Sequence, residues 1–273
     1  MLNFLLEKAL EIRKLILKTA INAKKGHIPP ALSWVEIGVA IFYSKVFRLD
    51  KKFRKDKNRD IFLLSKGHGC LTLYSILADL NFFKKKELDD FSSNGSLLPG
   101  HPDFKIPGVE NCSGSLGHGL GVAAGMAYSS KIKNTKTKIV VLLGDAECQE
   151  GSVWEAAMFS GKNKLNNLLA IIDRNRLGST DFTENYAPLE PLKKKFESFG
   201  WKTFEVDGHD ILKIIRYLNN FKNQIQLSNQ RPTCLICKTT KGKGVYFMES
   251  SKDWHHQMPS SSEIEIINKL YFQ

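Results

Sequence analysis

The chain has 273 residues, 42% of them hydrophobic, and a formal net charge of +12. This length and composition predict one large α/β domain with a sizeable core and argue against a disordered chain. No run approaches the roughly 18 apolar residues of a membrane span, and charges from Glu7 to Lys14 interrupt any signal-peptide core. We therefore expect a cytoplasmic protein without a membrane partner.

The basic charge raises the question of a nucleic-acid partner. The lysines form only small clusters, at 51–57, 84–86 and 193–195, without interleaved aromatic side chains. We interpret them as a solvated surface that also favours anionic sugar phosphates, and we expect no nucleic-acid partner. Five cysteines without framework spacing agree with a reducing compartment. Cys234 and Cys237 lie three apart in a predicted strand, so they should point to opposite faces rather than form a metal or redox pair.

The first elements are predicted to be helices. Residues 3–25 carry apolar side chains at helical spacing, which predicts an amphipathic helix. A second helix is predicted from Ser33 to about Phe47, with Glu36 completing a capping box. His27 lies in the loop between them. It is either a residue that caps a helix end or a site residue, and the residues alone leave both open.

A glycine-rich loop follows the first predicted strand. The strand covers 60–64, the loop contains His68, and a helix is predicted over 70–80. A strand, a glycine-rich loop and a helix in this order point backbone N–H groups at an anion. Residues 98–121 are the richest in glycine and proline, and they lead into a helix of small residues over about 118–130. Small side chains there allow close approach of a diphosphate or of a neighbouring protein chain.

The most informative stretch is a strand–helix–strand unit. Apolar runs at 139–143 and 168–172, with a helix over 152–162 between them, predict a right-handed βαβ unit of a parallel sheet. Both strands should end on the same sheet edge, where open α/β sheets bind ligands. Asp145 and Asn175 lie just past those two ends.

Asp145 and Asn175 are hard oxygen donors, which Mg²⁺ prefers and usually shares with substrate phosphates. Gly144 lets the backbone approach a phosphate closely. The residues therefore predict a magnesium–diphosphate site at this sheet edge. On spacing alone, two ordinary turns that close two strands are an equal alternative.

The C-terminal part continues the alternation of helices and strands. We predict a loop over 180–190, a helix over 191–200, a strand over 201–206, a turn over 207–210 that caps a helix to about Asn219, a polar linker over 220–230, a strand over 233–238 and a terminal helix over 262–273. The K-G-K-G text at 241–244 lacks the Walker spacing, so we do not predict a nucleotide site there. About five buried strands alternating with helices predict a single doubly wound α/β domain over 1–273, with a mainly parallel sheet and helices on both faces.

The central stretch resembles the thiamine diphosphate signature of transketolases, which opens with Gly-Asp-Gly and closes with a downstream Asn. Gly144, Asp145 and Asn175 match it, as does the QEG-x-x-WEAA text at 149–157. Ala146 replaces the third glycine. We expect diphosphate binding to survive this change, provided that the position does not need a positive φ.

Four further segments resemble transketolases in the family's order, so the resemblance covers nearly the whole chain and implies the thiamine diphosphate-binding fold. They are Gly26-His27, where Ile28 replaces a proline, LSKGH at 64–68, the text from LPGHP to GSLGHGL at 98–120, and the text from TTKGKGVYFMES to WHH at 239–256.

The resemblance implies roles for the matched residues. The implied metal ligands are Asp145, Asn175 and the backbone carbonyl of Leu177, holding Mg²⁺ or, as possible substitutes, Ca²⁺ or Mn²⁺. The implied cofactor-binding residues are His68, Gly117, His118, Gly144, Asp145, Ala146, Glu147 and Asn175. The implied catalytic histidines are His27, His68, His101 and either His255 or His256, of which the position after the tryptophan favours His255. Glu150 is expected to reach a subunit interface.

Whole transketolases are more than twice as long as this chain. Their central domain holds the aminopyrimidine of the cofactor and supplies a glutamate to its ring nitrogen, and a C-terminal domain follows. None of the motifs here provides that glutamate. The chain resembles the N-terminal subunit of a split transketolase, which implies transfer of a two-carbon ketol unit from a ketose phosphate to an aldose phosphate, as in the pentose phosphate pathway. We expect activity only with a C-terminal partner subunit, in a dimer or heterotetramer.

Three other functions compete with this interpretation. The nearest is another thiamine diphosphate enzyme of the same superfamily, such as a deoxyxylulose-phosphate synthase or a transketolase of specialised sugar synthesis. The second is a non-catalytic paralogue, against which the retained Asp145, Asn175, His68 and His101 argue. A dinucleotide oxidoreductase is disfavoured because no G-x-G-x-x-G follows the first strand.

Overall fold

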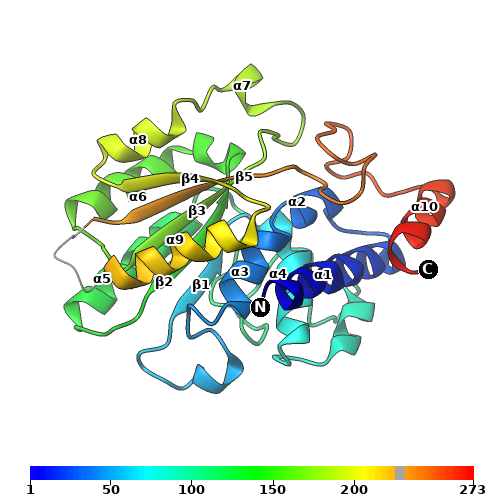
Figure 1. Ribbon diagram of the computed structural model, residues 1–273, viewed down its shortest axis with the longest axis horizontal. Helices are drawn as coiled ribbons and strands as arrows, with labels where there is room; N and C mark the ends of the chain where they lie inside the picture. Colours follow the sequence, from blue (N-terminus) through cyan, green and yellow to red (C-terminus); the bar gives the residue numbers. More distant parts are fainter. Residues whose placement is uncertain (225–230) are drawn as a thin grey trace.

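A parallel five-stranded sheet forms the centre of the part described by the computed structural model, residues 1–224 and 231–273 (Figure 1). The strand order is β1-β2-β3-β5-β4, and each neighbouring pair is parallel. The strands are Ile61–Leu64 (β1), Ile139–Gly144 (β2), Leu168–Arg174 (β3), Lys202–Asp207 (β4) and Thr233–Lys238 (β5). All five therefore end at the same edge, as the sequence predicted for β2 and β3.

Alternating side chains of each central strand enter two separate hydrophobic cores. In β2, Val140 and Leu142 belong to one core, while Val141 and Leu143 belong to the other. This follows from the two-residue period of a strand that is buried on both faces. Cys237 lies in the first core and Cys234 in the second, both as free thiols. The prediction that these two cysteines point to opposite faces is confirmed.

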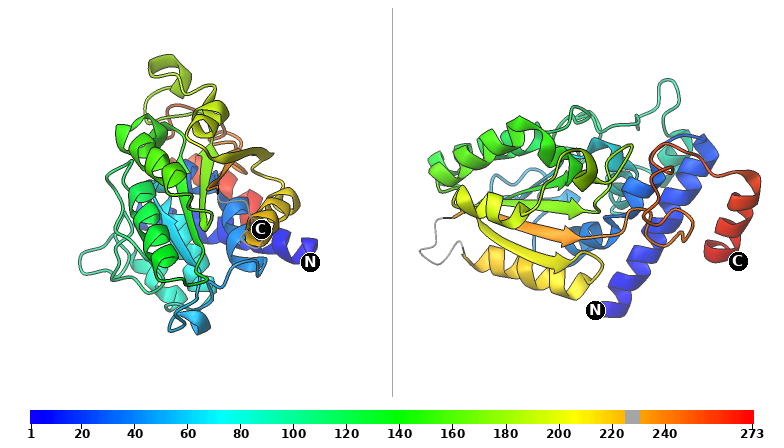
Figure 2. Two further views of the ribbon diagram at one scale, coloured as in Figure 1. Left: turned by 90° about the vertical axis from the view of Figure 1, so that its left-hand side faces the viewer. Right: turned by 90° about the horizontal axis from the view of Figure 1, so that it is seen from above.

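Helices cover both faces of the sheet, as Figure 2 shows in its left-hand view. One face carries α1 (Leu2–Ala23), α2 (Ile28–Leu32), α3 (Val35–Tyr43), α4 (Cys70–Asp79) and α9 (Ile211–Gln224). The other carries α5 (Gly119–Ile132), α6 (Gly151–Lys162) and α8 (Leu192–Ser198). The doubly wound architecture predicted from the sequence is therefore confirmed. The short α7 (Thr183–Tyr186) and the C-terminal α10 (Ser261–Tyr271) complete the described helices.

The predicted capping box at Ser33 and Glu36 is wrong. The chain instead forms α2 directly after His27, breaks at residues 33–34, and resumes as α3 without a side-chain cap. Two prolines in the first turn of α2 explain the earlier start, because proline is tolerated where backbone N–H groups have no helical partner. Glu36 bonds to Arg13 on α1, with 2.9 Å between Arg13 Nη2 and Glu36 Oε2, so a tertiary ion pair replaces the local cap.

Two predicted connections also contain helix. The predicted loop at 180–190 includes α7, and α9 continues past Asn219 to Gln224, so the predicted polar linker begins later than expected. Its residues 225–230 lie outside the described part of the chain. The predicted cap of α9 is present, because Asp210 Oδ1 accepts the backbone N–H of Lys213 at 3.0 Å.

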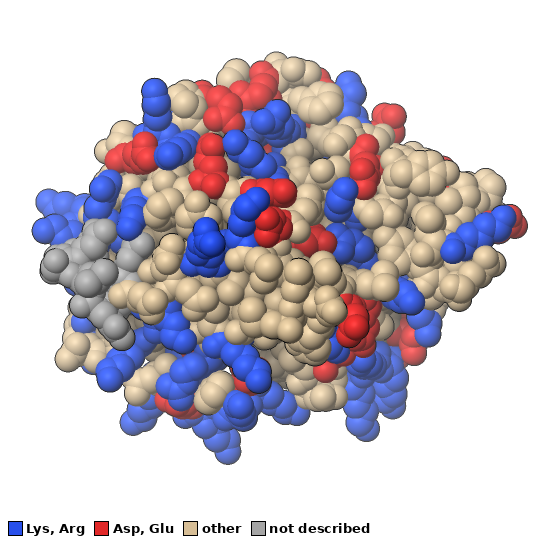
Figure 3. Space-filling view, in the orientation of Figure 1, with Lys and Arg blue, Asp and Glu red and all other residues tan. Residues whose placement is uncertain are grey.

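The surface carries both signs of charge. Figure 3 shows lysines and arginines spread over one face, with acidic side chains among them and no continuous basic stripe. Among the described helices, none combines the length and the apolar character needed to span a bilayer.

Candidate functional site

The ends of β1, β2, β3 and β5 meet at one pocket of about 270 Å³. Parallel strands bring segments that are distant in sequence to a common edge, so the loops after these four strands contribute lining residues, together with Pro30, Leu116 and His255 from other segments. The pocket is lined by Pro30, His68, Leu116, Gly144, Asp145, Ala146, Glu147, Gln149, Glu150, Asn175, Leu177, Gly178, Ser179, Tyr186, Lys241 and His255.

Asp145 follows β2 and is almost fully buried in the chain. Its Oδ1 accepts the N–H of Ala146 at 2.8 Å, and its Oδ2 accepts from the N–H of Arg176 at 2.5 Å and from Arg174 Nη1 at 3.0 Å. Burial raises the pKa of the Asp145 carboxyl, and the Arg174 guanidinium offsets this only in part. A further cation beside Asp145 would favour its charged form.

Arg174 is shared among three carboxylates. Besides Asp145, it contacts Glu184 Oε1 at 2.7 Å and Glu190 Oε1 at 3.0 Å through Nη2. One guanidinium therefore faces three carboxylates, of which only Asp145 is among the residues that line the pocket. A divalent cation suits the oxygen donors of Asp145 and Asn175.

Asn175 and Leu177 complete the oxygen donor set. The Asn175 side-chain oxygen accepts the N–H of Leu177 at 3.0 Å, which fixes the amide orientation. The Leu177 side chain is buried, and its backbone is held by a bridge to Phe182. An apolar residue is compatible with the expected role because only its carbonyl would ligate a metal.

Glu147 holds two glycines rather than facing the pocket with free oxygens. Its Oε1 accepts the N–H of Gly117 at 2.9 Å and the hydroxyl of Ser65, and its Oε2 accepts the N–H of Gly144 at 3.1 Å. Burial raises the pKa of Glu147, against these hydrogen bonds. Gly117 has φ +85°, and a Cβ there would lie 2.5 Å from Glu150 Cβ, so glycine is required.

Ala146 occupies the first position of a short 3-10 helix, Ala146–Gln149, and is not among the described residues with positive φ. The condition stated for replacing the third glycine, that position 146 should not need a positive φ, is therefore met. A glycine is not needed there for conformational reasons.

A buried ion pair ties three strand ends together beneath the pocket. Lys66, after β1, pairs with Asp173 of β3, and both side chains are fully buried. Lys66 Nζ also donates to the Pro30 carbonyl at 3.1 Å. Asp173 accepts from Ser33 at 2.5 Å and from Thr239 after β5. The network anchors the His68 loop and α2 against the sheet.

Four other histidines gather around His27, although the five come from four distant segments. The ring centroids of His68, His101, His255 and His256 lie 6.0, 6.0, 5.5 and 4.5 Å from that of His27. Burial, then the neighbouring His256 and His101, lower the pKa of His27 to about 4. Burial also lowers the pKa of His68. Such neutral rings are suited to hydrogen bonding with sugar hydroxyls.

Lys241 was not predicted as a site residue, although its K-G-K-G text at 241–244 belongs to a segment that resembles the family. Its ammonium is buried, donates to the Gly178 carbonyl at 2.6 Å and lies 2.7 Å from His255 Nδ1. Burial and the nearby Lys66 lower the pKa of Lys241 to about 8. Its place after β5 puts a cation in the lining of the pocket that Asp145 also lines.

Most predicted residues line this pocket, but His27, His101, Gly117, His118 and His256 are not among its lining residues. His255 lines the pocket, whereas the exposed His256 packs on His27, so the two candidates occupy different positions. Glu150 is exposed at the pocket edge. His118 does not line this pocket. It lies at the start of α5 beside a separate open hollow, and its Nδ1 contacts the Leu116 carbonyl at 3.0 Å.

Comparisons with known proteins agree with this fold. The family model for the transketolase thiamine diphosphate-binding domain matches residues 7–271. One of the subunits of an apulose-4-phosphate transketolase from Phocaeicola vulgatus is 40% identical over 93% of this chain and 88% of that protein. A 6-deoxy-6-sulfo-D-fructose transketolase subunit from a Clostridium species is 35% identical over 90% and 88%. The transketolase structure from Campylobacter jejuni superposes with a TM-score of 0.84 at 29% identity, over 98% of this chain and 42% of that one.

Fold and site define an α/β domain with a pocket at the carboxyl edge of its parallel sheet. The chain belongs to the transketolase family, as its thiamine diphosphate-binding domain. The resemblance to the N-terminal subunit of a split transketolase is confirmed, because the relatives named as single subunits are matched over most of their length. The chain spans about two fifths of the solved transketolase, 42% of its length.

Proposed function

We propose that this chain binds magnesium and thiamine diphosphate as the diphosphate-side subunit of a two-chain transketolase. The reaction would move a two-carbon ketol unit from a ketose phosphate to an aldose phosphate. The observation that carries this proposal is the common pocket of Asp145, Asn175, Leu177, His68 and His255.

The oxygen donors fit the proposed cation. Asp145, Asn175 and the Leu177 carbonyl would hold Mg²⁺, with Ca²⁺ or Mn²⁺ as substitutes, because all three supply hard oxygen ligands at one pocket. Water and the cofactor's own phosphate oxygens would supply the remaining ligands that octahedral Mg²⁺ requires.

The other pocket residues would orient the cofactor and the sugar. When bound, the cofactor supplies the nucleophilic carbon that takes up the ketol unit. Gly144 would let the diphosphate approach the backbone of β2, and His68 would line the cofactor with the Gly117 loop. His27, His101 and His255 would donate hydrogen bonds to substrate hydroxyls and move protons, as their convergence around one point allows.

A partner chain would complete the site. We propose that it carries the pyrimidine-binding side, and that the two chains assemble as a dimer or heterotetramer with Glu150 near a subunit interface. Two observations support this proposal. The chain covers 88% of each of two relatives that are named as single transketolase subunits, but only 42% of a solved transketolase. The free cysteines agree with a cytoplasmic location.

Specialised sugar chemistry is a second candidate for the substrate. Two relatives are named for apulose-4-phosphate and for 6-deoxy-6-sulfo-D-fructose rather than for the pentose phosphates. An acceptor panel of branched, sulfonated and ordinary sugar phosphates would separate this candidate from a general transketolase. A non-catalytic role predicts that no acceptor reacts.

The first test is calorimetric titration of thiamine diphosphate with Mg²⁺ into the purified chain, with and without a co-expressed candidate partner. The variant is Asp145→Ala, and the matched control is Asp89→Ala, an exposed acid outside the pocket. We expect binding by the wild type with its partner and by the control, and a loss for Asp145→Ala. Equal affinity of the Asp145 variant, or no binding in any combination, would overturn the cofactor proposal.

A further inference from the structure

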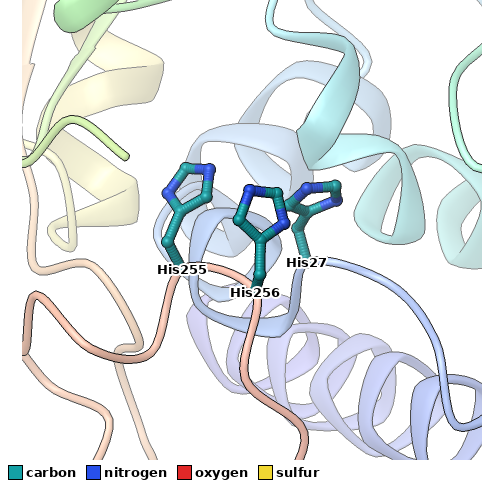
Figure 4. A group of neighbouring side chains, drawn as sticks. All are labelled: His27, His255 and His256. Atoms are coloured by element: carbon teal, nitrogen blue, oxygen red, sulfur yellow. The ribbon is translucent and has the colours of Figure 1, made fainter. Parts of the chain in front are cut away.

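Three of the five clustered histidines form a tighter group of their own. Ring nitrogens of His27, His255 and His256 all lie within 4.8 Å of one another. Figure 4 shows their rings converging from two segments, the loop before α2 and the loop before α10. His27 and His255 are half-buried, whereas His256 is exposed. One side of the group is therefore open to solvent.

The ring spacing matches what a metal ion held by three imidazoles requires. With Zn–N bonds of about 2.0–2.1 Å and tetrahedral angles, the centroids of three histidine rings lie about 5 Å apart. Here the three centroid distances are 4.5, 4.6 and 5.5 Å, all in tilted edge-to-face arrangements. Small side-chain rotations would bring the three nitrogens to about 3.3 Å from one another, as tetrahedral coordination demands.

We propose that His27, His255 and His256 form a binding site for a zinc-class transition-metal cation, separate from the magnesium site. Three neutral nitrogen ligands select Zn²⁺, Co²⁺, Ni²⁺ or Cu²⁺ over Mg²⁺, which prefers oxygen. The fourth coordination position faces the open side, so water or a substrate oxygen completes the shell. On the proposed function, a metal here occupies the histidines that meet the sugar and therefore inhibits the reaction.

The charge of Lys241 disfavours metal binding at these three histidines. Its ammonium lies 2.7 Å from His255 Nδ1, where it repels a cation and competes for the ring. Metal affinity should therefore be lower than at a closed structural zinc site. Replacing Lys241 by methionine should raise it. Loss of a ligand histidine should therefore lower the metal affinity and loss of Lys241 should raise it. A nonspecific surface effect would not reproduce these opposite changes.

The test is titration of ZnCl₂ into the whole chain without thiamine diphosphate, in excess Mg²⁺. All proteins carry Cys112→Ser, because Cys112 is exposed and the other four cysteines are buried. We expect His256→Ala to weaken Zn²⁺ binding by about 100-fold or more, since even loss of an outer partner of a ligand costs about 10–100-fold. Lys241→Met should tighten binding, and His118→Ala, an exposed histidine elsewhere, should leave the Zn²⁺ affinity unchanged.

Cobalt supplies the coordination readout. Co²⁺ added to the wild type should give the intense visible bands of a tetrahedral site, and His256→Ala should lose them. Equal Zn²⁺ affinity of the wild type and His256→Ala, or octahedral Co²⁺ spectra in both, would overturn the proposal. Because no cofactor or substrate is present, this result is independent of whether the chain acts in a transketolase.

Discussion

The Lys241 ammonium lies 2.7 Å from Nδ1 of His255, and both residues line the pocket that contains Asp145. Burial and the charge of Lys241 lower the pKa of His255 to about 3. At neutral pH the histidine is therefore uncharged, and Lys241 remains the cation of this corner. A buried cation and a divalent metal in one pocket would together neutralise the charge of a bound diphosphate.

Lys241→Met should weaken binding of magnesium–thiamine diphosphate by about 10–100-fold, because a charge-assisted hydrogen bond contributes about 1.5–3 kcal/mol. Calorimetry on the complex with the partner measures this directly. The control is Lys243→Met, a neighbouring lysine whose Nζ lies 3.5 Å from Glu249 Oε1, outside the pocket lining. Equal losses in the two variants would show that general surface charge, not Lys241, attracts the cofactor.

Removal of divalent metal should abolish cofactor binding. The Asp145 carboxylate lines the pocket, and without a divalent cation beside it this charge repels a diphosphate. Titration of thiamine diphosphate after EDTA treatment should show no binding, and Mg²⁺, Ca²⁺ or Mn²⁺ should restore it. Undiminished binding in EDTA would contradict the metal assignment for Asp145 and Asn175.

Ala146→Gly should not improve cofactor binding. Ala146 has no positive φ, so restoring the glycine typical of the family relieves no strain. The extra freedom of the unfolded chain should lower the free energy of unfolding by about 0.5–1 kcal/mol. Urea denaturation measures the stability change, and calorimetry should give a cofactor affinity within about threefold of the wild type. A tenfold gain in affinity would show that the alanine costs binding.

The sheet was predictable from the sequence because its strands are short apolar runs. The predicted run at 168–172 became β3, extended by Asp173 and Arg174. This extension was not predictable, because charged residues in a strand depend on partners that lie far away. Asp173 pairs with Lys66, more than a hundred positions earlier in the sequence, and Arg174 pairs with Glu190 across a loop.

The histidine cluster was predictable only through family resemblance. No spacing rule connects His27 to His255, and only the common sheet edge brings them together. The segment that carries Lys241 also matches the family, but the sequence alone does not indicate that this lysine is buried against His255. Glu36 illustrates the opposite error, since the local capping pattern was present but Arg13 and His209 compete for the carboxylate.

Asp79 should contribute stability that depends on pH. Burial alone would raise its pKa, but hydrogen bonds from Lys8, Lys85 and Tyr43 outweigh burial and lower the pKa to about 2. A carboxylate with a lowered folded pKa stabilises the protein above its unfolded value of 3.8, and this contribution is lost as the pH falls towards 2. Asp79→Asn should therefore cost about 1–2 kcal/mol at pH 7 and progressively less between pH 4 and 2.

Urea denaturation at several pH values measures this difference, with the exposed Asp89→Asn as the control. The control should match the wild type at every pH. A cost for Asp79→Asn that stays constant from pH 7 to pH 3 would contradict the assigned ion pairs.

Glu147 should stabilise the pocket through backbone groups rather than by touching the cofactor. Glu147→Ala leaves the N–H groups of Gly117 and Gly144 and the Ser65 hydroxyl without their acceptor. Each unpaired buried donor destabilises the fold by about 1–3 kcal/mol. Removal of the Glu147 carboxylate, whose pKa is raised by burial, also removes the cost of burying it and offsets part of this loss. We expect the free energy of unfolding to fall by about 2–4 kcal/mol.

The Glu147→Gln variant separates geometry from charge. Its amide oxygen can still accept at one of the two positions, so the loss of stability should be about half that of alanine. Hydrogen exchange at the Gly117 amide should accelerate in both variants, and more in the alanine variant. The exposed Glu150→Ala should leave the unfolding free energy of the isolated chain within about 0.5 kcal/mol. If Glu147→Ala lowers cofactor affinity while Gly117 exchange and stability stay at wild-type values, Glu147 contacts the cofactor directly and the positioning role is wrong.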